Sequence, residues 1–285
     1  MEWVRTIDEV RARRARWAAA GEALALVPTM GNLHAGHLRL VERARELAPR
    51  VAVSIFVNPL QFAPGEDLER YPRTPEDDRR ALAAAGVDLV FVPEETELYP
   101  RGRAAATRVR VPELGDILCG AFRPGHFEGV ATVVLKLFNI FQPDWAVFGK
   151  KDYQQLCLIR RLVEDLDLTV RIAAVDTVRE PDGLAMSSRN RYLGSEERAR
   201  AGALYATLRA LGERLRAGED DYAAVEAEGL ERLRAAGLRP EYVAVRAPDL
   251  APPAPGAPRL VVLAAAHLGA ARLIDNLEIE RPAGL

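Results

Sequence analysis

The feature that most constrains the fold is a series of short apolar runs separated by segments of helical periodicity. Each run has the length of a buried strand and ends in polar or turn-forming residues. Strands that alternate with helices form a parallel sheet covered on both faces, so we expect a Rossmann-like α/β domain. The predicted strands are residues 22–27, 51–57, 88–92, 145–148 and 170–178. One predicted helix begins near His37, and three more cover residues 75–86, 130–141 and 152–166.

The last third of the chain has a different pattern, with two helical segments followed by short strands. At 285 residues the chain is long enough for two ordinary domains. We therefore expect an α/β domain over residues 1–178 and a smaller α+β domain over residues 179–285, with the boundary within residues 176–194. The predicted elements of the smaller domain are a long helix capped by Ser195, a helix over 222–236, and strands over 242–245, 260–263 and 271–279.

The loop after the first predicted strand carries two histidines, in the run His34-Ala35-Gly36-His37. The first amide N–H groups of the following helix lack intrahelical partners and carry the positive end of the helix dipole. Gly31 and Gly36 permit a tight turn and the close approach of a ligand. Two structural histidines beside a helix cap are the alternative. The strand, turn and helix around the pair favour a nucleotide-phosphate site, where imidazoles donate to oxygens that become more negative during reaction.

A second glycine-containing turn, residues 148–155, again runs from a predicted strand into a predicted helix. Lys151 could neutralise phosphate oxygens there, and Asp152 could accept hydrogen bonds from ribose hydroxyls. A solvated helix start with Asp152 as its N-cap explains the same residues. Because ligands gather at the carboxyl ends of parallel strands, we expect this turn and the histidine loop to open on the same edge of the sheet.

The loop over residues 182–190 combines two hydroxyls, Ser187 and Ser188, with the guanidinium of Arg189. Such a set could clamp phosphate oxygens, although an interdomain turn with ordinary local hydrogen bonds accounts for it slightly better in isolation. Gln61, after the second predicted strand, could contact a polar substrate or cap a turn. Residues 64–67 fit the tip of a mobile lid.

Two adjacent acids, Asp77 and Asp78, lie at the start of the helix predicted over residues 75–86. Acidic residues at a helix start usually form a solvated face, and Mg²⁺ binding is the minority interpretation. His126 and His267 fit packing or local hydrogen bonds better than catalysis. These four residues therefore stand outside the predicted catalytic set.

Composition excludes several classes of protein. The formal net charge is −2 and no Lys/Arg-rich block occurs, which argues against a nucleic-acid partner. No run reaches the length of a membrane span, and the first residues contain no apolar signal core, so we expect a cytoplasmic protein without a membrane partner. Cys119 and Cys157 are the only cysteines, too few for a disulfide scaffold and wrongly spaced for zinc, and we expect buried free thiols.

The histidine pair and the downstream loop together resemble the class I nucleotidyl-transfer superfamily, whose signatures are HxGH and a KMSKS-like loop. Within it, the chain resembles the pantothenate synthetase (pantoate–β-alanine ligase) family over most of its first 195 residues. The matching segments are Pro28-Thr29-Met30-Gly31 with His34-Ala35-Gly36-His37, Phe56-Val57-Asn58-Pro59 with Gln61-Phe62, Tyr71-Pro72-Arg73-Thr74, Gly149 with Lys151-Asp152-Tyr153-Gln154-Gln155, and Asp182-Gly183 with Met186-Ser187-Ser188-Arg189-Asn190-Arg191-Tyr192-Leu193.

The resemblance implies an ATP-dependent reaction in two steps. The carboxylate of pantoate attacks the α-phosphorus of ATP, giving pantoyl adenylate and pyrophosphate, and the amine of β-alanine then displaces AMP. It also implies a homodimer, a C-terminal domain that closes over ATP, and Mg²⁺ carried mainly by the phosphates, with no tightly bound prosthetic group and no protein cage for the metal.

The resemblance also implies roles for individual residues. His37 would be the proton donor, Gly149 and Asp152 would hold the ribose, the backbone near Val178 would hold the adenine, and Gln61 and Gln155 would bind pantoate, with Gln61 also near β-alanine. Lys150 stands where the family commonly has an acid, which leaves its role open. The implied catalytic residues are His34, His37, Lys151, Ser187, Ser188 and Arg189. The implied ATP-binding residues are Met30, Gly31, Asn32, Leu33, His34, Ala35, Gly36, His37, Gly149, Lys150, Lys151, Asp152, Val178, Met186, Ser187, Ser188 and Arg189.

Three other functions share parts of this pattern. An RNA-binding relative of the aminoacyl-tRNA synthetases has both signatures, but the small C-terminal unit lacks the basic surface that it would need. A nucleotidyltransferase that stops at adenylation does not account for Gln61 and Gln155 together. A noncatalytic nucleotide sensor would bind ATP without releasing pyrophosphate.

Overall fold

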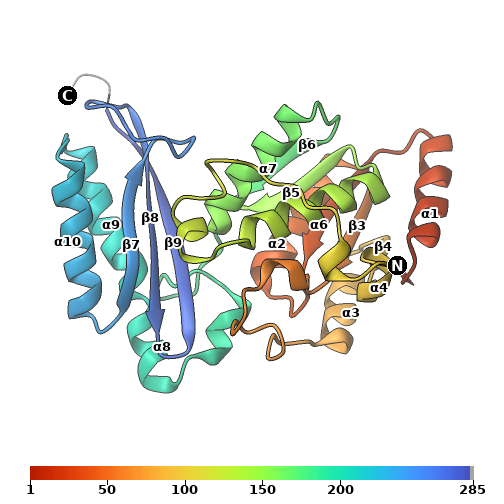
Figure 1. Cartoon of the computed structure of the whole chain (residues 1–285), viewed down its shortest axis with the longest axis horizontal. Coiled ribbons are helices and arrows are strands. Elements are labelled where there is room, and N and C mark those ends of the chain that lie inside the picture. Colours follow the sequence, from red (N-terminus) through yellow and green to blue (C-terminus); the bar gives the residue numbers. More distant parts are fainter. Residues whose placement is uncertain (283–285) are drawn as a thin grey trace. The chain divides into compact units, whose positions relative to one another are not determined.

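The computed structural model describes residues 1–282, which separate into two compact units (Figure 1). The first unit contains residues 1–150 and 158–176, and the second contains residues 151–157 together with the chain from Thr177 onward. Residues 151–157 thus belong to the second unit, although the strands before and after them lie in the first.

The first unit is built on a six-stranded sheet in which every strand pair is parallel, in the order β1-β4-β3-β2-β5-β6. This confirms the predicted α/β fold class. Small and β-branched apolar residues fill the central strands, as expected where both faces are buried. The strands are β1 (Glu2–Val4), β2 (Leu24–Thr29), β3 (Arg50–Ile55), β4 (Leu89–Phe91), β5 (Trp145–Gly149) and β6 (Arg171–Val175).

Helices pack on both faces of this sheet. Ala25 and Val27 of β2 share an apolar cluster with Val41 of the second helix, whereas Phe91 of β4 makes an edge-to-face contact with Phe141 of the sixth helix. Val90, the residue before Phe91 on β4, belongs to the cluster of Val41, and successive strand residues point to opposite faces of the sheet. The second and sixth helices therefore cover different faces. The helices up to the end of β5 are α1 (Ile7–Ala19), α2 (Ala35–Leu47), η1 (Pro59–Gln61), α3 (Pro75–Ala84), α4 (Glu95–Leu98), η2 (Arg103–Ala105), α5 (Cys119–Phe122) and α6 (His126–Phe141).

The first two elements, β1 and α1, were not predicted. Strand β1 is three residues long and pairs with β4 at the edge of the sheet. Helix α1 begins at a capping box formed by Thr6 and Glu9, but Val10 is its one buried residue. A helix with so little apolar surface has no marked hydrophobic periodicity, so its pattern gave no signal.

The second unit contains a three-stranded antiparallel sheet of β7 (Arg239–Arg246), β8 (Arg259–Leu268) and β9 (Ala271–Glu280). Helices α9 and α10 pack on it (Figure 1). Leu208 and Leu211 belong to the same buried core as Val262. This agrees with the predicted α+β character and confirms the third strand. The helices that precede this sheet are η3 (Lys150–Asp152), α7 (Tyr153–Asp165), η4 (Ser188–Tyr192), α8 (Ser195–Ala201), α9 (Ala203–Arg216) and α10 (Tyr222–Ala235), of which η3 and α7 extend across the division between the units.

Two predictions about the helix after Leu193 were wrong. The N-cap is Gly194 rather than Ser195, and the side chain of Glu197 accepts a hydrogen bond from the Gly194 amide at 2.8 Å. The helix is also interrupted at Gly202, where α8 gives way to α9. Within residues 1–282, no helix combines the length and the apolar character needed to cross a membrane.

Candidate functional site

The predicted site loops of the first unit follow three neighbouring strands. Strand β2 pairs with β3 on one side and β5 on the other, all in parallel, so their carboxyl ends meet at one edge. The order of the strands along the chain reverses direction between β2 and β5. Open parallel sheets bind their ligands at such a switch point.

The two histidines form the start of α2. His34 is the N-cap, and its Nδ1 accepts a hydrogen bond from the amide of Gly36 at 3.1 Å. Nδ1 of His37 accepts from the amide of His34 at 3.3 Å, and the two ring centroids are 4.1 Å apart. Because each Nδ1 accepts, the hydrogen-bond network assigns the proton of each neutral ring to Nε2, which makes both Nε2–H groups donors. The histidines are therefore helix-capping residues, and the same contacts set the tautomer that a phosphate site requires.

The turn between β2 and α2 is held in an unusual backbone conformation. Gly31 and Asn32 both have positive φ angles, of 78° and 51°. The hydroxyl of Thr29 donates to the carbonyl of Ser54 at 2.8 Å and accepts from the Gly31 amide at 3.2 Å. This hydroxyl fixes the start of the turn, and Asn32 at its centre is buried.

Asp78 occupies a different environment from the solvated helix face that was predicted for it. Its side chain is 2% exposed, and its carboxylate accepts hydrogen bonds from the amides of Asn32 at 2.9 Å and Leu33 at 2.8 Å. The hydroxyl of Thr74 donates to the same carboxylate at 3.1 Å. The acidic pattern of the helix start did not reveal this, because the contact depends on a loop 45 residues earlier in the chain. Asp77, by contrast, is exposed and pairs with Arg80.

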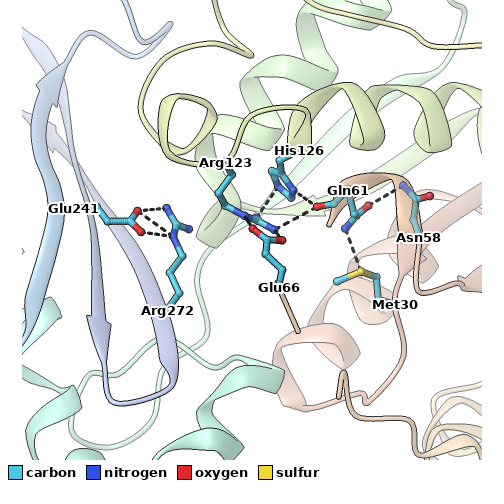
Figure 2. Close-up of polar contacts among 8 residues, drawn as sticks. All are labelled: Met30, Asn58, Gln61, Glu66, Arg123, His126, Glu241 and Arg272. Atoms are coloured by element: carbon cyan, nitrogen blue, oxygen red, sulfur yellow. Dashed lines mark hydrogen bonds and ion pairs between the residues drawn. The ribbon is translucent and has the colours of Figure 1, made fainter. Parts of the chain in front are cut away.

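Gln61 lies beside the histidine loop, at the end of η1 (Figure 2). Its Nε2 donates to Sδ of Met30 at 3.1 Å, and its Oε1 accepts from Nδ2 of Asn58 at 3.2 Å. Asn58 is 1% exposed and also donates to the carbonyl of Gly129 at 3.0 Å, while its Oδ1 accepts from the hydroxyl of Tyr99 at 2.8 Å. Gln61, which was predicted to bind pantoate, thus contacts Met30, the first residue of the loop that was predicted to bind ATP. Asn58 is the buried residue that orients it.

The backbone of Gln61 is held from its other side (Figure 2). Nδ1 of His126 lies 2.8 Å from the Gln61 carbonyl, and Arg123 donates to the same oxygen at 3.3 Å. Arg123 also makes two hydrogen bonds to the carboxylate of Glu66, at 2.7 and 2.6 Å. Burial by itself would raise the pKa of Glu66, but the Arg123 guanidinium outweighs burial and holds this pKa below its usual range. The loop around Glu66 is therefore tied to the start of α6. His126 has the local hydrogen-bonding role that was expected.

The end of β5 brings two more predicted residues to the same sheet edge. A Cβ added to Gly149 would lie 3.9 Å from Leu40 of α2, so the glycine faces the helix that begins at the histidine pair. Nζ of Lys150 lies 2.8 Å from the carboxylate of Asp176. Lys150 is thus part of an ion pair rather than simply solvent-facing.

The remaining predicted residues belong to the second unit, where Lys151 and Asp152 lie in η3. The carbonyl of Lys151 accepts a hydrogen bond from Nδ2 of Asn276 on β9 at 3.0 Å. Nζ of Lys151 lies 3.7 Å from the carboxylate of Asp152. Helix α7 begins at Tyr153, whose hydroxyl donates to the carbonyl of Pro248 at 3.0 Å, and Gln155 is in its first turn. These contacts attach residues 151–157 to the C-terminal sheet.

Residues 178–186 form a tight hairpin in the second unit. The Met186 amide donates to the carbonyl of Val178 at 2.9 Å, which brings the predicted adenine and phosphate positions together. Ser187 is the N-cap of η4, with its hydroxyl accepting from the Arg189 amide at 3.3 Å, and Ser188 is 7% exposed. Local hydrogen bonds therefore order this loop, as the alternative interpretation required. They also place Val178, Met186, Ser187, Ser188 and Arg189 next to one another.

A buried ion pair supports the same hairpin. Arg179 makes two hydrogen bonds to Asp275, at 2.6 and 3.0 Å, and donates to the carbonyl of Gly183 at 3.1 Å. Its guanidinium also lies over the ring of Tyr205, 3.6 Å from the centroid. Asp275 is 3% exposed, and burial raises its pKa while Arg179 acts in the opposite direction. Breaking one side of such a pair is costly because the other charge stays buried.

Other titratable clusters have structural explanations. Arg272 donates to the carboxylate of Glu241 on the C-terminal sheet at 2.7 to 3.2 Å (Figure 2). Nε2 of His267 lies 2.7 Å from the same carboxylate. Cys119 and Cys157 are buried and form no disulfide bond, as predicted, and Sγ of Cys157 donates to the carbonyl of Pro248 at 3.6 Å. Among residues 1–282, no group of three or more His, Cys, Asp and Glu side chains is placed to hold a metal ion.

Known proteins resemble the chain over its full length. A family model described as pantoate-β-alanine ligase matches residues 2–278. The pantothenate synthetase of Thioalkalivibrio sulfidiphilus is 61% identical over 283 residues, which cover 99% of each chain. The solved pantothenate synthetase of Thermus thermophilus has a TM-score of 0.92 at 50% identity, covering 99% of this chain and 100% of that one. The pantoate-β-alanine ligase of Francisella tularensis, solved in complex with β-γ ATP and β-alanine, has a TM-score of 0.82 at 35% identity, covering 97% of each chain.

Proposed function

Because the chain belongs to the pantoate–β-alanine ligase family of enzymes, we propose that it joins pantoate to β-alanine through a pantoyl-adenylate intermediate. In the first step, a carboxylate oxygen of pantoate attacks the α-phosphorus of ATP and pyrophosphate leaves. In the second step, the amine of β-alanine attacks the acyl carbon, AMP leaves, and the amine loses a proton. Pantothenate is the product. The observation that carries this proposal is the contact between Gln61 and Met30, because we assign the first of these residues to pantoate and the second to ATP.

The catalytic contribution of the first unit is electrostatic. Attack at phosphorus spreads negative charge over the nonbridging and leaving oxygens, so fixed N–H donors stabilise the transition state without a covalent enzyme intermediate. The hydrogen bonds that His34 and His37 accept at Nδ1 favour Nε2–H donors, and both imidazoles stand at the positive end of α2. We assign His37 as the proton donor and His34 as its companion on the phosphates. The ATP loop from Met30 to His37 supplies the backbone around them.

The second unit contributes cations and hydroxyls in this proposal. Lys151 neutralises phosphate charge, and Ser187, Ser188 and Arg189 bind phosphate oxygens. The backbone at Val178, which the hairpin holds against Met186, binds the adenine. Asp152 holds the ribose together with Gly149 of the first unit, and Gln155 binds pantoate together with Gln61, also of the first unit.

Magnesium fits this site as a partner of the phosphates rather than of a protein cage. Mg²⁺ usually keeps several waters and binds through one or two carboxylates together with substrate phosphates. The carboxylate of Asp78, the weakly predicted metal ligand, is already occupied by two amides and a hydroxyl. When bound with ATP, the ion would supply positive charge to the leaving pyrophosphate. We also propose that the enzyme is a cytoplasmic homodimer, as the family resemblance implies.

Oxygen transfer tests the intermediate directly. Pantoate labelled with ¹⁸O in its carboxylate should transfer one ¹⁸O atom to AMP during turnover, because the oxygen that attacks phosphorus leaves with AMP. Without β-alanine, pyrophosphate release should depend on pantoate and slow after about one turnover. Formation of ADP and phosphate, or unlabelled AMP from labelled pantoate, would refute the adenylate.

Alanine substitution tests the assigned donors. We expect His37→Ala and Lys151→Ala each to lower the rate of pantoate-dependent pyrophosphate release by about 100-fold or more, the scale for loss of a charge-stabilising group. His267→Ala is the matched control, because His267 pairs with Glu241 on the C-terminal sheet and its loss should change the rate less than about threefold. A loss below about threefold in both His37→Ala and Lys151→Ala would remove these residues from the catalytic set.

A further inference from the structure

A buried carboxylate at the start of α3 is bonded entirely to the ATP loop and to its own helix cap. The two oxygens of Asp78 accept from the amides of Asn32 and Leu33 and from the hydroxyl of Thr74. The side chain is 2% exposed. A carboxylate so removed from water is stabilised only where several donors converge on it, so these contacts are not incidental.

The backbone that Asp78 binds has a conformation that the hydrogen bonds of a helix or a strand do not stabilise. Gly31 and Asn32 have consecutive positive φ angles, a combination that neither a helix nor a strand provides. A Cβ added to Gly31 would lie 3.1 Å from Oδ2 of Asp78 and 2.9 Å from Ile55, so the carboxylate fills the space beside the glycine. The amides of Asn32 and Leu33 turn inward to this carboxylate, which fixes the direction in which the following residue leaves the turn.

The following residue is His34, the N-cap of α2. Its ring accepts from the Gly36 amide, and its own amide donates to the ring of His37. Any rotation of the turn at Asn32 and Leu33 therefore moves both imidazoles and the first amides of α2. We propose that Asp78 is a positioning residue for adenylation, which acts on ATP through the backbone of residues 32–34. This inference rests on the proposed function, since it assumes that the loop binds the phosphates of ATP.

Asp78→Asn is the most informative substitution because it preserves the shape of the side chain. Either orientation of the amide places an NH₂ group opposite a backbone N–H, so one of the two loop amides loses its acceptor. Hydrogen bonds to charged groups are among the stronger ones, and we expect kcat/KM for ATP to fall about 10- to 100-fold, chiefly through KM. The KM for β-alanine, which enters after adenylation, should stay within twofold. A purely structural role would lower the melting temperature and the amount of active enzyme without changing the KM for ATP.

Asp77→Asn is the matched control. Asp77 is the preceding residue, carries the same charge, and pairs with Arg80 at the surface, so its substitution should leave the KM for ATP within twofold. Thr74→Val gives a second, milder variant if Asp78→Asn folds poorly. Thr74 makes no side-chain capping bond to α3, so the change removes its hydroxyl from Asp78, and from Oδ1 of Asn32 at 3.4 Å, without uncapping the helix. We expect a threefold to tenfold rise in the KM for ATP.

The outcomes separate this inference from the proposed function. If the unaltered enzyme releases pyrophosphate in response to pantoate but Asp78→Asn and Thr74→Val retain its KM for ATP, the positioning role is refuted and the function stands. If the unaltered enzyme shows no pantoate-dependent pyrophosphate, the proposed function itself fails. An increase in the KM for ATP in both variants, with Asp77→Asn unchanged, supports the positioning role.

Discussion

Gly129→Ala should damage pantoate binding although alanine is the better helix former. Gly129 lies within α6, where alanine would gain about 1 kcal/mol over glycine from helix propensity. A Cβ at this position would lie 2.6 Å from the amide nitrogen of Gln61 and nearer still to the carbonyl of Leu60. Ordinary contacts of a Cβ begin at 3.4 Å, and the nearest atom, the carbonyl oxygen of Leu60, would lie at 2.3 Å, so the backbone of η1 must retreat by about 1.1 Å. Both atoms belong to the backbone, and rotation of a side chain cannot relieve the clash.

This retreat has two measurable consequences. Overpacking of this kind typically costs about 1–3 kcal/mol, so we expect a net loss of stability despite the gain in helix propensity. Because Gln61 moves with η1, we expect kcat/KM for pantoate to fall about 10- to 100-fold, as a displacement near 1 Å can cost about 100-fold. Thermal unfolding and the pantoate dependence of pyrophosphate release measure the two effects.

Gly212→Ala provides the control for this prediction. Gly212 is also inside a helix, but its added Cβ would meet Cδ2 of Leu277 at 2.8 Å, the far end of a flexible side chain. We expect unchanged kinetics and a change in stability of less than about 1 kcal/mol. A Gly129→Ala enzyme with raised stability and an unaltered KM for pantoate would show that η1 does not pack on α6 as described.

Two further predictions concern groups that support the site loops. The pKa of Glu66 is lowered in the folded state, so the pair of Glu66 with Arg123 stabilises the protein at pH values above 4.5, the ordinary pKa, and this stabilisation is lost as the pH falls through the lowered pKa. Glu66→Gln should therefore flatten the decline of melting temperature below pH 4.5. An unchanged acid profile of the melting temperature would contradict the pairing. Asn276→Leu leaves the carbonyl of Lys151 without its donor, a loss of about 1–3 kcal/mol that should appear as a fall of about fivefold to 150-fold in kcat/KM for ATP in pyrophosphate-release assays. An effect on stability alone would confine Asn276 to folding.

The sequence was informative where short-range pattern determines structure. Buried strands such as β2 and β3 have continuous apolar runs, so their positions and the parallel sheet could be predicted. Strand β1 has three residues and α1 has one buried residue, and neither leaves a recognisable pattern. The loops that end at His37 and Gln61 could be placed on one sheet edge because the fold class fixes where carboxyl ends meet.

Long-range polar contacts were beyond the reach of pattern reasoning. Asp77 and Asp78 have the same chemistry and adjacent positions, yet one is exposed and pairs with Arg80 while the other is buried against the turn before α2. Adjacent residues point about 100° apart around a helix axis, so only one of the two acids can face inward. Which acid faces inward depends on how α3 is rotated about its axis, and the acidic pattern does not determine that rotation. Lys150 illustrates the same limit, since its partner Asp176 follows β6.

The supporting contacts are organised so that each set of proposed ligands is held within its own unit. Asp78 binds the turn that leads to His34, and both belong to the first unit. Asn276 binds the carbonyl of Lys151 within the second unit, where the adjacent Asp275 holds Arg179 at the base of the hairpin that precedes Ser187. Each set of proposed ligands is therefore ordered by buried acceptors and donors of its own unit. Under the proposed function, preorganisation of this kind would let the residues assigned to the phosphates keep their geometry while ATP enters or pyrophosphate leaves.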